Sequence, residues 1–208
     1  ISYSEFIYNS IEELKANPPH ADCYITGSDQ VWTMLLSIEG NAAYYLDFGK
    51  DDVIRISYAA SFGRPYYPVE LCSKLSLLLK KFKAISVREK EGVEICKSLG
   101  LKATHVLDPT LLLKKENYLC FCKNTDDYKR NIYIYSINIR TPHELYWDEV
   151  KKFAYENNLP ITVTTSSGNI PGREIYKDVD YCYATISEWL SQINNAELVV
   201  TTSFHGVV

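Results

Sequence analysis

Short apolar runs alternate with longer amphipathic stretches along most of the chain. Apolar runs bounded by Gly, Pro or polar residues predict buried strands, and apolar positions three to four residues apart predict helices. We expect strands over 23–26, 53–60, 84–87, 104–107, 132–137, 159–165 and 198–201, and helices over 69–82, 90–99, 143–157 and 186–194. This alternation predicts an α/β fold with mostly parallel sheets and helices on both faces.

The pattern weakens between residues 110 and 130 and is most polar over 123–127. We therefore predict two domains: an N-terminal Rossmann-like α/β domain over 1–128 and a C-terminal one over 129–208. In such domains the ligand lies at the carboxyl ends of the strands. The chain opens with Ile1 and stops at Val208, inside an expected element. We expect the first domain to be incomplete at its start and the second at its end.

Polar or flexible residues follow five of the predicted strands, which suggests a shared crevice at one side of the fold. These segments are 27–29, 61–63, 88–89, 108–109 and 203–206. In the first, Ser28 or Asp29 is expected to cap a following helix, whose exposed N–H groups suit an anion. Asp29 is also a candidate to bind an acceptor hydroxyl or to hold a catalytic base. In the fourth, Asp108 is expected to start a turn after its strand.

A histidine stands on the turn that follows the last predicted strand. Histidine is the residue type whose charge changes near neutral pH, so His205 is a candidate general acid or base. Gly206 allows the backbone to turn tightly there, and Ser203 and Gly206 are candidate anion-binding residues. The alternative is a structural histidine, which is the usual role of a single His.

Arg88 leaves its strand where a helix begins, so a guanidinium and the positive end of the helix point the same way. An arginine in this position can hold a phosphate or a carboxylate through two parallel hydrogen bonds. The alternative is an ion pair with one of the nearby acidic residues, Glu89, Glu91 or Glu94.

Composition excludes several classes of function. A net charge of −4 at pH 7 argues against a nucleic-acid partner, and there is no apolar run long enough to span a membrane. The six cysteines are scattered without a C-x-x-C pair, which favours reduced thiols in a cytoplasmic protein and argues against structural zinc. The phosphate-loop, dinucleotide and zinc-protease motifs are absent. We expect no metal and no cofactor.

Five stretches together resemble the polysaccharide pyruvyl transferase family. In order they are GSDQVW (27–32), ISYAASFG (56–63), SVREKEG (86–92), VLDPTLLL (106–113) and NAELVVTTSFHG (195–206). Five stretches in the family's order, spread over nearly the whole chain, are specific. Family members often carry an arginine two positions before the histidine of the last stretch, where this chain has Ser203.

The resemblance implies a two-domain fold like that of the B-type glycosyltransferases. It also implies transfer of an enolpyruvyl group from phosphoenolpyruvate to two sugar hydroxyls, which gives a pyruvate ketal during bacterial surface polysaccharide assembly. By the same resemblance, His205 is the general acid or base and Arg88 holds the donor anion.

The implied partners are phosphoenolpyruvate as donor substrate and a lipid-linked or nucleotide-linked saccharide as acceptor. The implied location is the cytoplasm, with a peripheral contact at the inner face of the cell membrane left open. Two alternatives also remain open: a nucleotide-sugar glycosyltransferase of the same fold, and a non-catalytic carbohydrate-binding module.

Overall fold

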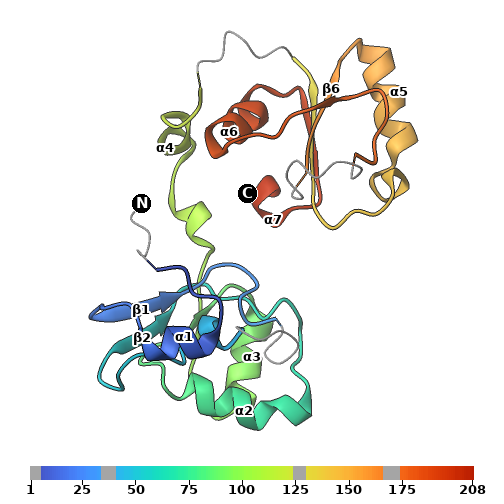
Figure 1. Ribbon diagram of the computed structural model, residues 1–208. Helices are drawn as coiled ribbons and strands as arrows, with labels where there is room; N and C mark the ends of the chain where they lie inside the picture. The colour runs from blue at the N-terminus through green and yellow to red at the C-terminus, as the bar shows by residue number, and fades with distance from the viewer. Residues whose placement is uncertain (1–5, 34–40, 124–129, 166–173) are drawn as a thin grey trace. The chain divides into compact units, whose positions relative to one another are not determined.

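The computed structural model describes residues 6–33, 41–123, 130–165 and 174–208. The chain forms two compact units, Ile1–Leu112 (unit 1) and Leu113–Val208 (unit 2), coloured blue to green and green to red in Figure 1. The division falls before the polar segment near residue 128 at which we placed the boundary. Within unit 2, Lys123 explains this difference, because its N–H donates to Ser191 Oγ (2.8 Å) and its Nζ pairs with Glu188 (2.7 Å).

The strands of unit 1 are parallel and follow one another in chain order. Strand β1 (Cys23–Thr26) pairs with β2 (Ile54–Ser57), and β3 (Ser86–Val87) pairs with β4 (Thr104–His105). Isolated parallel bridges, Ile56 to Ala84 and Ala60 to Val87, connect β2 to the segment of β3. The four predicted strands of this unit are therefore confirmed, in shorter form, as neighbours in one parallel arrangement.

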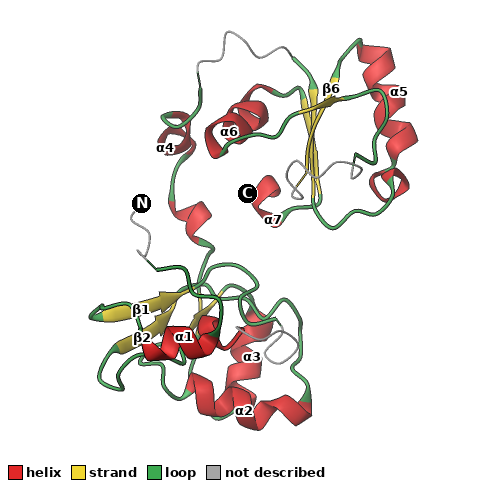
Figure 2. Ribbon diagram, viewed as in Figure 1, coloured by secondary structure: helices red, strands yellow, loops and turns green. Residues whose placement is uncertain are grey.

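Helices and 3₁₀ turns complete unit 1 (Figure 2). They are α1 (Ile11–Ala16), η1 (Asn41–Tyr45), α2 (Val69–Leu79), α3 (Lys90–Ser98) and η2 (Pro109–Leu112). The apolar periodicity predicted α2 and α3. It did not predict α1, which buries none of its residues and begins at an N-cap, Ser10, whose Oγ accepts a hydrogen bond from the Glu13 N–H (3.1 Å).

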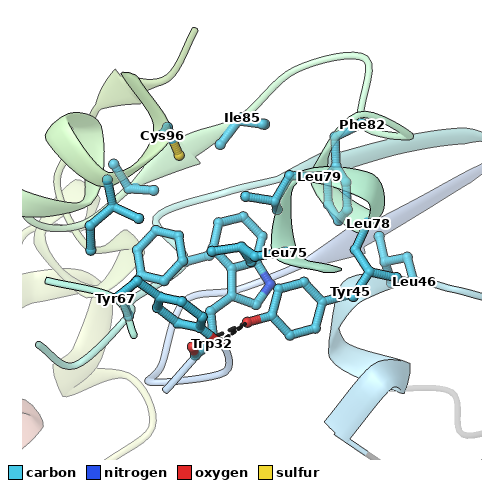
Figure 3. Close-up of a cluster of buried hydrophobic side chains, with 14 of the residues drawn as sticks. Trp32, Tyr45, Leu46, Tyr67, Leu75, Leu78, Leu79, Phe82, Ile85 and Cys96 are labelled. Atoms are coloured by element: carbon cyan, nitrogen blue, oxygen red, sulfur yellow. Dashed lines mark hydrogen bonds between the residues drawn. The ribbon is translucent and has the colours of Figure 1, made fainter. Parts of the chain in front are cut away.

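Aromatic side chains form the centre of the core of unit 1 (Figure 3). Trp32 is fully buried, stacks on Tyr45 (ring centroids 5.6 Å apart) and meets Phe82 edge-on (5.7 Å). The Tyr45 hydroxyl donates to the Trp32 carbonyl (3.1 Å), and burial raises the pKa of that hydroxyl. Burial of one such ring contributes about 2–3 kcal/mol to folding. Trp32 thus fixes the loop that follows β1 to the core.

Unit 2 is a four-stranded parallel sheet in the order β7-β6-β5-β8. Its strands are β5 (Ile132–Ser136), β6 (Ile161–Thr165), β7 (Asp180–Tyr181) and β8 (Leu198–Thr201). Numbered within the unit, this order is 3-2-1-4, which is also the order of four adjacent strands in doubly wound parallel sheets. The α/β prediction is confirmed. Strand β7 was missed because two residues carry too little pattern to be recognised.

Helices cover both faces of this sheet, as Figure 1 shows for α5 and α6. Residues alternate between the two faces of a strand. Ile132 and Ile134 of β5 pack with Trp147 of α5 (Trp147–Asn157), whereas Tyr135 meets Trp189 of α6 (Ile186–Asn195) edge-on (5.3 Å). The remaining elements are α4 (Lys115–Leu119), η4 (Pro142–Leu145) and α7 (Phe204–Val207).

Candidate functional site

The ends of β1 and β2 interlock in unit 1. Gly27 has φ +139°, and a Cβ built on it would lie 1.9 Å from the Tyr58 carbonyl oxygen. The Asp29 carbonyl accepts the Ser61 N–H (3.1 Å), and the Ser61 carbonyl accepts the Trp32 N–H (3.0 Å). Only glycine fits at position 27, because the two loops approach each other backbone to backbone.

Ser28 and Asp29 do not cap a helix at this loop. Residues 28–33 form bends and a turn, and the segment that follows, 34–40, lies outside the described residues. The exposed Asp29 carboxylate instead accepts the N–H of Gln30 through Oδ1 (2.7 Å). No helix starts within 28–33, so the expected cap is wrong there, because the loop folds back onto Ser61.

Arg88 lies between two carboxylates at the carboxyl end of β3. Its Nε donates to Glu89 Oε1 (3.0 Å) and its Nη1 to Asp108 Oδ2 (3.3 Å). The Arg88 side chain is 9% exposed, that of Asp108 0% and that of Glu89 37%. The ion pair with Glu89 is one that the sequence suggested, whereas Asp108 comes from the neighbouring strand segment and was not expected.

Each of these two carboxylates also accepts hydrogen bonds from groups other than Arg88. Ser61 Oγ donates to Glu89 Oε1 (2.8 Å) and accepts the Gly63 N–H (3.0 Å). Asp108 Oδ1 accepts the N–H (3.0 Å) and the hydroxyl (2.7 Å) of Thr110. The predicted turn that starts at Asp108 is confirmed by these bonds. A connected polar network thus joins the four strand ends of unit 1.

In unit 2 the strand order changes direction between β5 and β8. From β5 the chain passes through α5 to β6 on one side, whereas β8 lies on the other side of β5. Parallel sheets bind ligands at this switch point, beyond the carboxyl ends of the strands. The segment 203–206 begins two residues after the end of β8 at Thr201, so its residues stand at that point.

Hydroxyl groups join the two strands at the switch point. Thr202 Oγ1 accepts the Ile137 N–H (2.9 Å) and donates to the Ile137 carbonyl (2.9 Å). Thr201 Oγ1 donates to the Tyr135 carbonyl (2.7 Å) and accepts the Ser203 N–H (3.0 Å). These bonds set where the chain leaves β8 and enters the short helix α7.

Ser203, His205 and Gly206 differ in how far they are exposed. Ser203 is buried (4% exposed) and precedes α7, while His205 is half-buried on α7, its ring edge-on to Phe204 (5.3 Å). Gly206 donates its N–H to the Ser203 carbonyl (3.0 Å). A Cβ at Gly206 would lie 2.4 Å from Thr201 Oγ1, so glycine lets α7 pack closely onto the strand ends.

The six candidate residues fall into two groups, one in each unit. Ser28, Asp29 and Arg88 lie at the strand ends of unit 1, and Ser203, His205 and Gly206 at the switch point of unit 2. Of the five segments expected to converge, four meet in unit 1 through the network around Ser61. The sequence did not reveal that Asp108 pairs with Arg88, or that Ser61 holds Glu89, the other partner of Arg88. Both residues lie in segments that the sequence singled out.

The described residues contain neither a metal-ligating cluster nor a membrane-spanning helix. Within those ranges, His, Cys, Asp and Glu side chains form no group of three or more that could hold a metal ion. None of the helices in the same ranges is long and apolar enough to cross a membrane.

Comparison with known proteins places the chain in a family. The family model for polysaccharide pyruvyl transferases matches residues 2–208, which include both strand-end regions. No curated protein and no solved structure matches the chain. Because the family model spans almost the entire sequence, the chain belongs to the polysaccharide pyruvyl transferase family.

Proposed function

We propose that this chain forms pyruvate ketals on a saccharide, with phosphoenolpyruvate as donor. In the reaction, the methylene carbon of the donor takes up a proton and becomes a methyl group. A sugar hydroxyl forms a bond to the adjacent carbon, and the bond from that carbon to the phosphate oxygen breaks. A second hydroxyl then closes the ketal. One hydroxyl proton balances the proton gained by carbon, and the other leaves with phosphate.

His205 at the switch point is the observation that carries this proposal. The family to which the chain belongs performs transfer to saccharides, and His205 is a half-buried, titratable group at the edge where a parallel sheet of this order takes its ligand. A neutral imidazole can accept the proton of an attacking hydroxyl, and an imidazolium can protonate the enol carbon. We assign His205 to this proton transfer.

Arg88 is proposed to hold the phosphate or carboxylate of the donor, and Asp29 an acceptor hydroxyl. A fixed guanidinium stabilises charge on a departing phosphate more effectively than a mobile one. Further anion-binding residues are proposed for each unit separately: Ser28 in unit 1, and Ser203 and Gly206 in unit 2, with Ser203 in place of the arginine that other members often have.

The proposed acceptor is a lipid-linked or nucleotide-linked saccharide used in surface polysaccharide assembly. The proposal further includes a two-domain fold of the B-type glycosyltransferase kind, no cofactor, and a place in the cytoplasm at or near the inner face of the cell membrane. A nucleotide-sugar donor and a non-catalytic carbohydrate-binding role are the competing outcomes of the test below.

The test combines donor binding with product analysis. Thermal shift is measured with phosphoenolpyruvate and, in parallel, with UDP-, GDP- and CMP-sugars, since a ligand of the native state raises the melting temperature. Phosphate release and the methyl signal of a ketal are then followed with an acceptor saccharide. We expect phosphoenolpyruvate, and none of the nucleotide sugars, to raise the melting temperature of the protein. We also expect phosphoenolpyruvate to release phosphate when the acceptor saccharide is present. Stabilisation only by a nucleotide sugar would overturn the donor assignment, and binding of saccharide without turnover would favour the binding module.

Replacement of the histidine tests its role in the same assay. We expect His205→Ala to lower kcat about 10²–10⁴-fold, the usual contribution of a positioned acid or base. His143, exposed on η4, is the matched control, and His143→Ala is expected to keep the parent kcat. Full turnover by His205→Ala would remove this residue from the mechanism.

A further inference from the structure

We propose that Glu89 and Asp108 are positioning residues that fix the guanidinium plane of Arg88 for the donor anion. This inference rests on the proposed function and extends it to two residues that do not themselves touch the donor. It starts from the contacts of Arg88 with both carboxylates at the carboxyl end of β3.

The two contacts restrain the guanidinium at different nitrogens. Glu89 accepts from Nε and Asp108 accepts from Nη1. A guanidinium is planar, and a single hydrogen bond would leave it free to rotate about that bond. Bonds at two nitrogens, from carboxylates on different segments of chain, remove this rotation and define the plane of the group.

The carboxylates are in turn restrained by groups outside the ion pair. Ser61 donates to the same Glu89 oxygen that accepts from Arg88, and Thr110 places two donors on the other oxygen of Asp108. A functional side chain keeps its position to within a fraction of an ångström only when the residues around it are themselves held by hydrogen bonds and packing. Ser61 and Thr110, at the strand ends of unit 1, provide these surrounding hydrogen bonds.

A second arginine in the same unit provides an internal comparison. Arg55 on β2 is buried, and its guanidinium donates only to backbone carbonyls in the bonds the structure describes. That arrangement satisfies loop carbonyls and needs no carboxylate. Arg88 is instead surrounded by two charges, an arrangement that is weak evidence for stability because apolar residues stabilise a core equally well. The desolvation cost of burying these charged groups is explained if the site requires a fixed orientation of the Arg88 guanidinium.

Substitutions of Glu89 separate geometry from charge. In Glu89→Gln the amide oxygen can still accept from Ser61 and from Arg88 Nε, whereas Glu89→Ala removes the acceptor. We expect Glu89→Ala to raise the KM for phosphoenolpyruvate about tenfold, the usual worth of one hydrogen bond to a charged group, and to leave kcat nearly unchanged. Glu89→Gln is expected to restore most of the affinity. Glu94→Ala, which removes an exposed carboxylate on α3, is the matched control with the parent KM.

Substitution of Asp108 tests the other side of the guanidinium. Asp108→Asn keeps an oxygen for Thr110 but presents an amide N–H to Arg88 Nη1. We expect it to raise the same KM at least tenfold. A role in stability alone would lower the melting temperature and leave the KM of the remaining folded enzyme unchanged, and that result in both Glu89→Ala and Asp108→Asn would overturn the proposal.

A measurement without substrate separates this inference from the proposed function. The Nε–H signal of Arg88, assigned by its loss in Arg88→Lys, is followed in the full chain by NMR. We expect slow exchange with water in the parent and in Glu89→Gln, and fast exchange in Glu89→Ala. Exchange in the parent as fast as that of the exposed Arg140 would overturn the positioning role. Absence of phosphoenolpyruvate binding by a parent with a slow Arg88 signal would overturn the donor assignment and leave the fixed guanidinium established.

Discussion

The carboxyl ends of the parallel strands form differently built edges in the two units. In unit 1 the strands follow chain order, and their ends are joined by charged groups, with Arg88 between Glu89 and Asp108. In unit 2 the strand order reverses direction, and the ends of β5 and β8 are joined by the hydroxyls of Thr201 and Thr202.

The difference shows that the same strand-to-loop pattern can give two kinds of polar edge. The edge of unit 1 carries two carboxylates against one guanidinium, so the charge of the guanidinium is compensated within the edge itself. The edge of unit 2 joins its strands through neutral groups and carries a half-buried histidine. In the proposed function, Arg88 on the edge of unit 1 orients the donor anion and His205 on the edge of unit 2 transfers the proton.

The substitution with the largest expected effect on stability removes a charged group from the edge of unit 1. Asp108→Ala removes a fully buried carboxylate and leaves Arg88 with one partner fewer, which is expected to lower the free energy of unfolding by about 3–5 kcal/mol. Urea denaturation of the parent and the variant measures this loss. The double variant Asp108→Ala with Arg88→Met is the control, because it removes both charges and should regain stability. A single variant as stable as the parent would show that the pair contributes nothing.

The interlocked loops of unit 1 should respond almost as strongly. Gly27→Ala places a methyl group against the Tyr58 carbonyl, and we expect a loss of about 3 kcal/mol. Gly100 also has positive φ (+72°) but has nothing within 4 Å of its Cβ position, so Gly100→Ala should cost only about 1 kcal/mol. Equal losses for the two variants would mean that the close approach at Gly27 is unimportant.

The neutral edge of unit 2 should be less sensitive to a single change. Thr202→Val removes the hydroxyl that both accepts from and donates to Ile137, at nearly constant volume. Because Thr202 is exposed and water can replace these bonds, we expect a loss of about 1 kcal/mol in urea denaturation. A loss as large as that of Asp108→Ala would contradict the contrast between the two edges.

The smallest effect is a dependence of stability on pH away from both edges. In unit 2, hydrogen bonds from Lys123 and then Thr185 lower the pKa of Glu188 to about 2. A carboxylate whose pKa is depressed in the folded state stabilises the fold at pH values above its pKa in the unfolded chain, near 4.5. This contribution is lost as the pH falls towards 2. The melting temperatures of the parent and of Glu188→Gln should therefore differ at pH 7 and converge in acid. A constant difference would contradict this ion pair.

The matched group in unit 1 is Asp47. Burial alone would raise the pKa of its carboxyl, but Lys15 (2.8 Å) and Lys81 (2.6 Å) hold it below its usual range. Asp47→Asn should show the same convergence in acid, because the sign of the shift is the same. A variant that is equally destabilised at every pH would indicate lost packing.

The sequence predicted most strands of the sheets because buried parallel strands are apolar runs between polar turns. It also predicted the Asp108 turn, and it offered Glu89 as one of three acidic partners in the alternative interpretation of Arg88, since these residues are close in the chain. It could not predict the contact of Arg88 with Asp108, because that depends on the pairing of β3 with β4 across 20 residues. The cap expected at Ser28 failed for a similar reason, as the loop is held by the distant Ser61.

The assignment of proton transfer to His205 at the switch point of unit 2 is tested most directly by the amide chemical shifts of the full chain. On titration with phosphoenolpyruvate, we expect the amides of 137–138 and 203–206 and the ring of His205 to shift saturably. The ring of His143 should not change. Turnover of phosphoenolpyruvate with no shift at 203–206 would contradict this assignment.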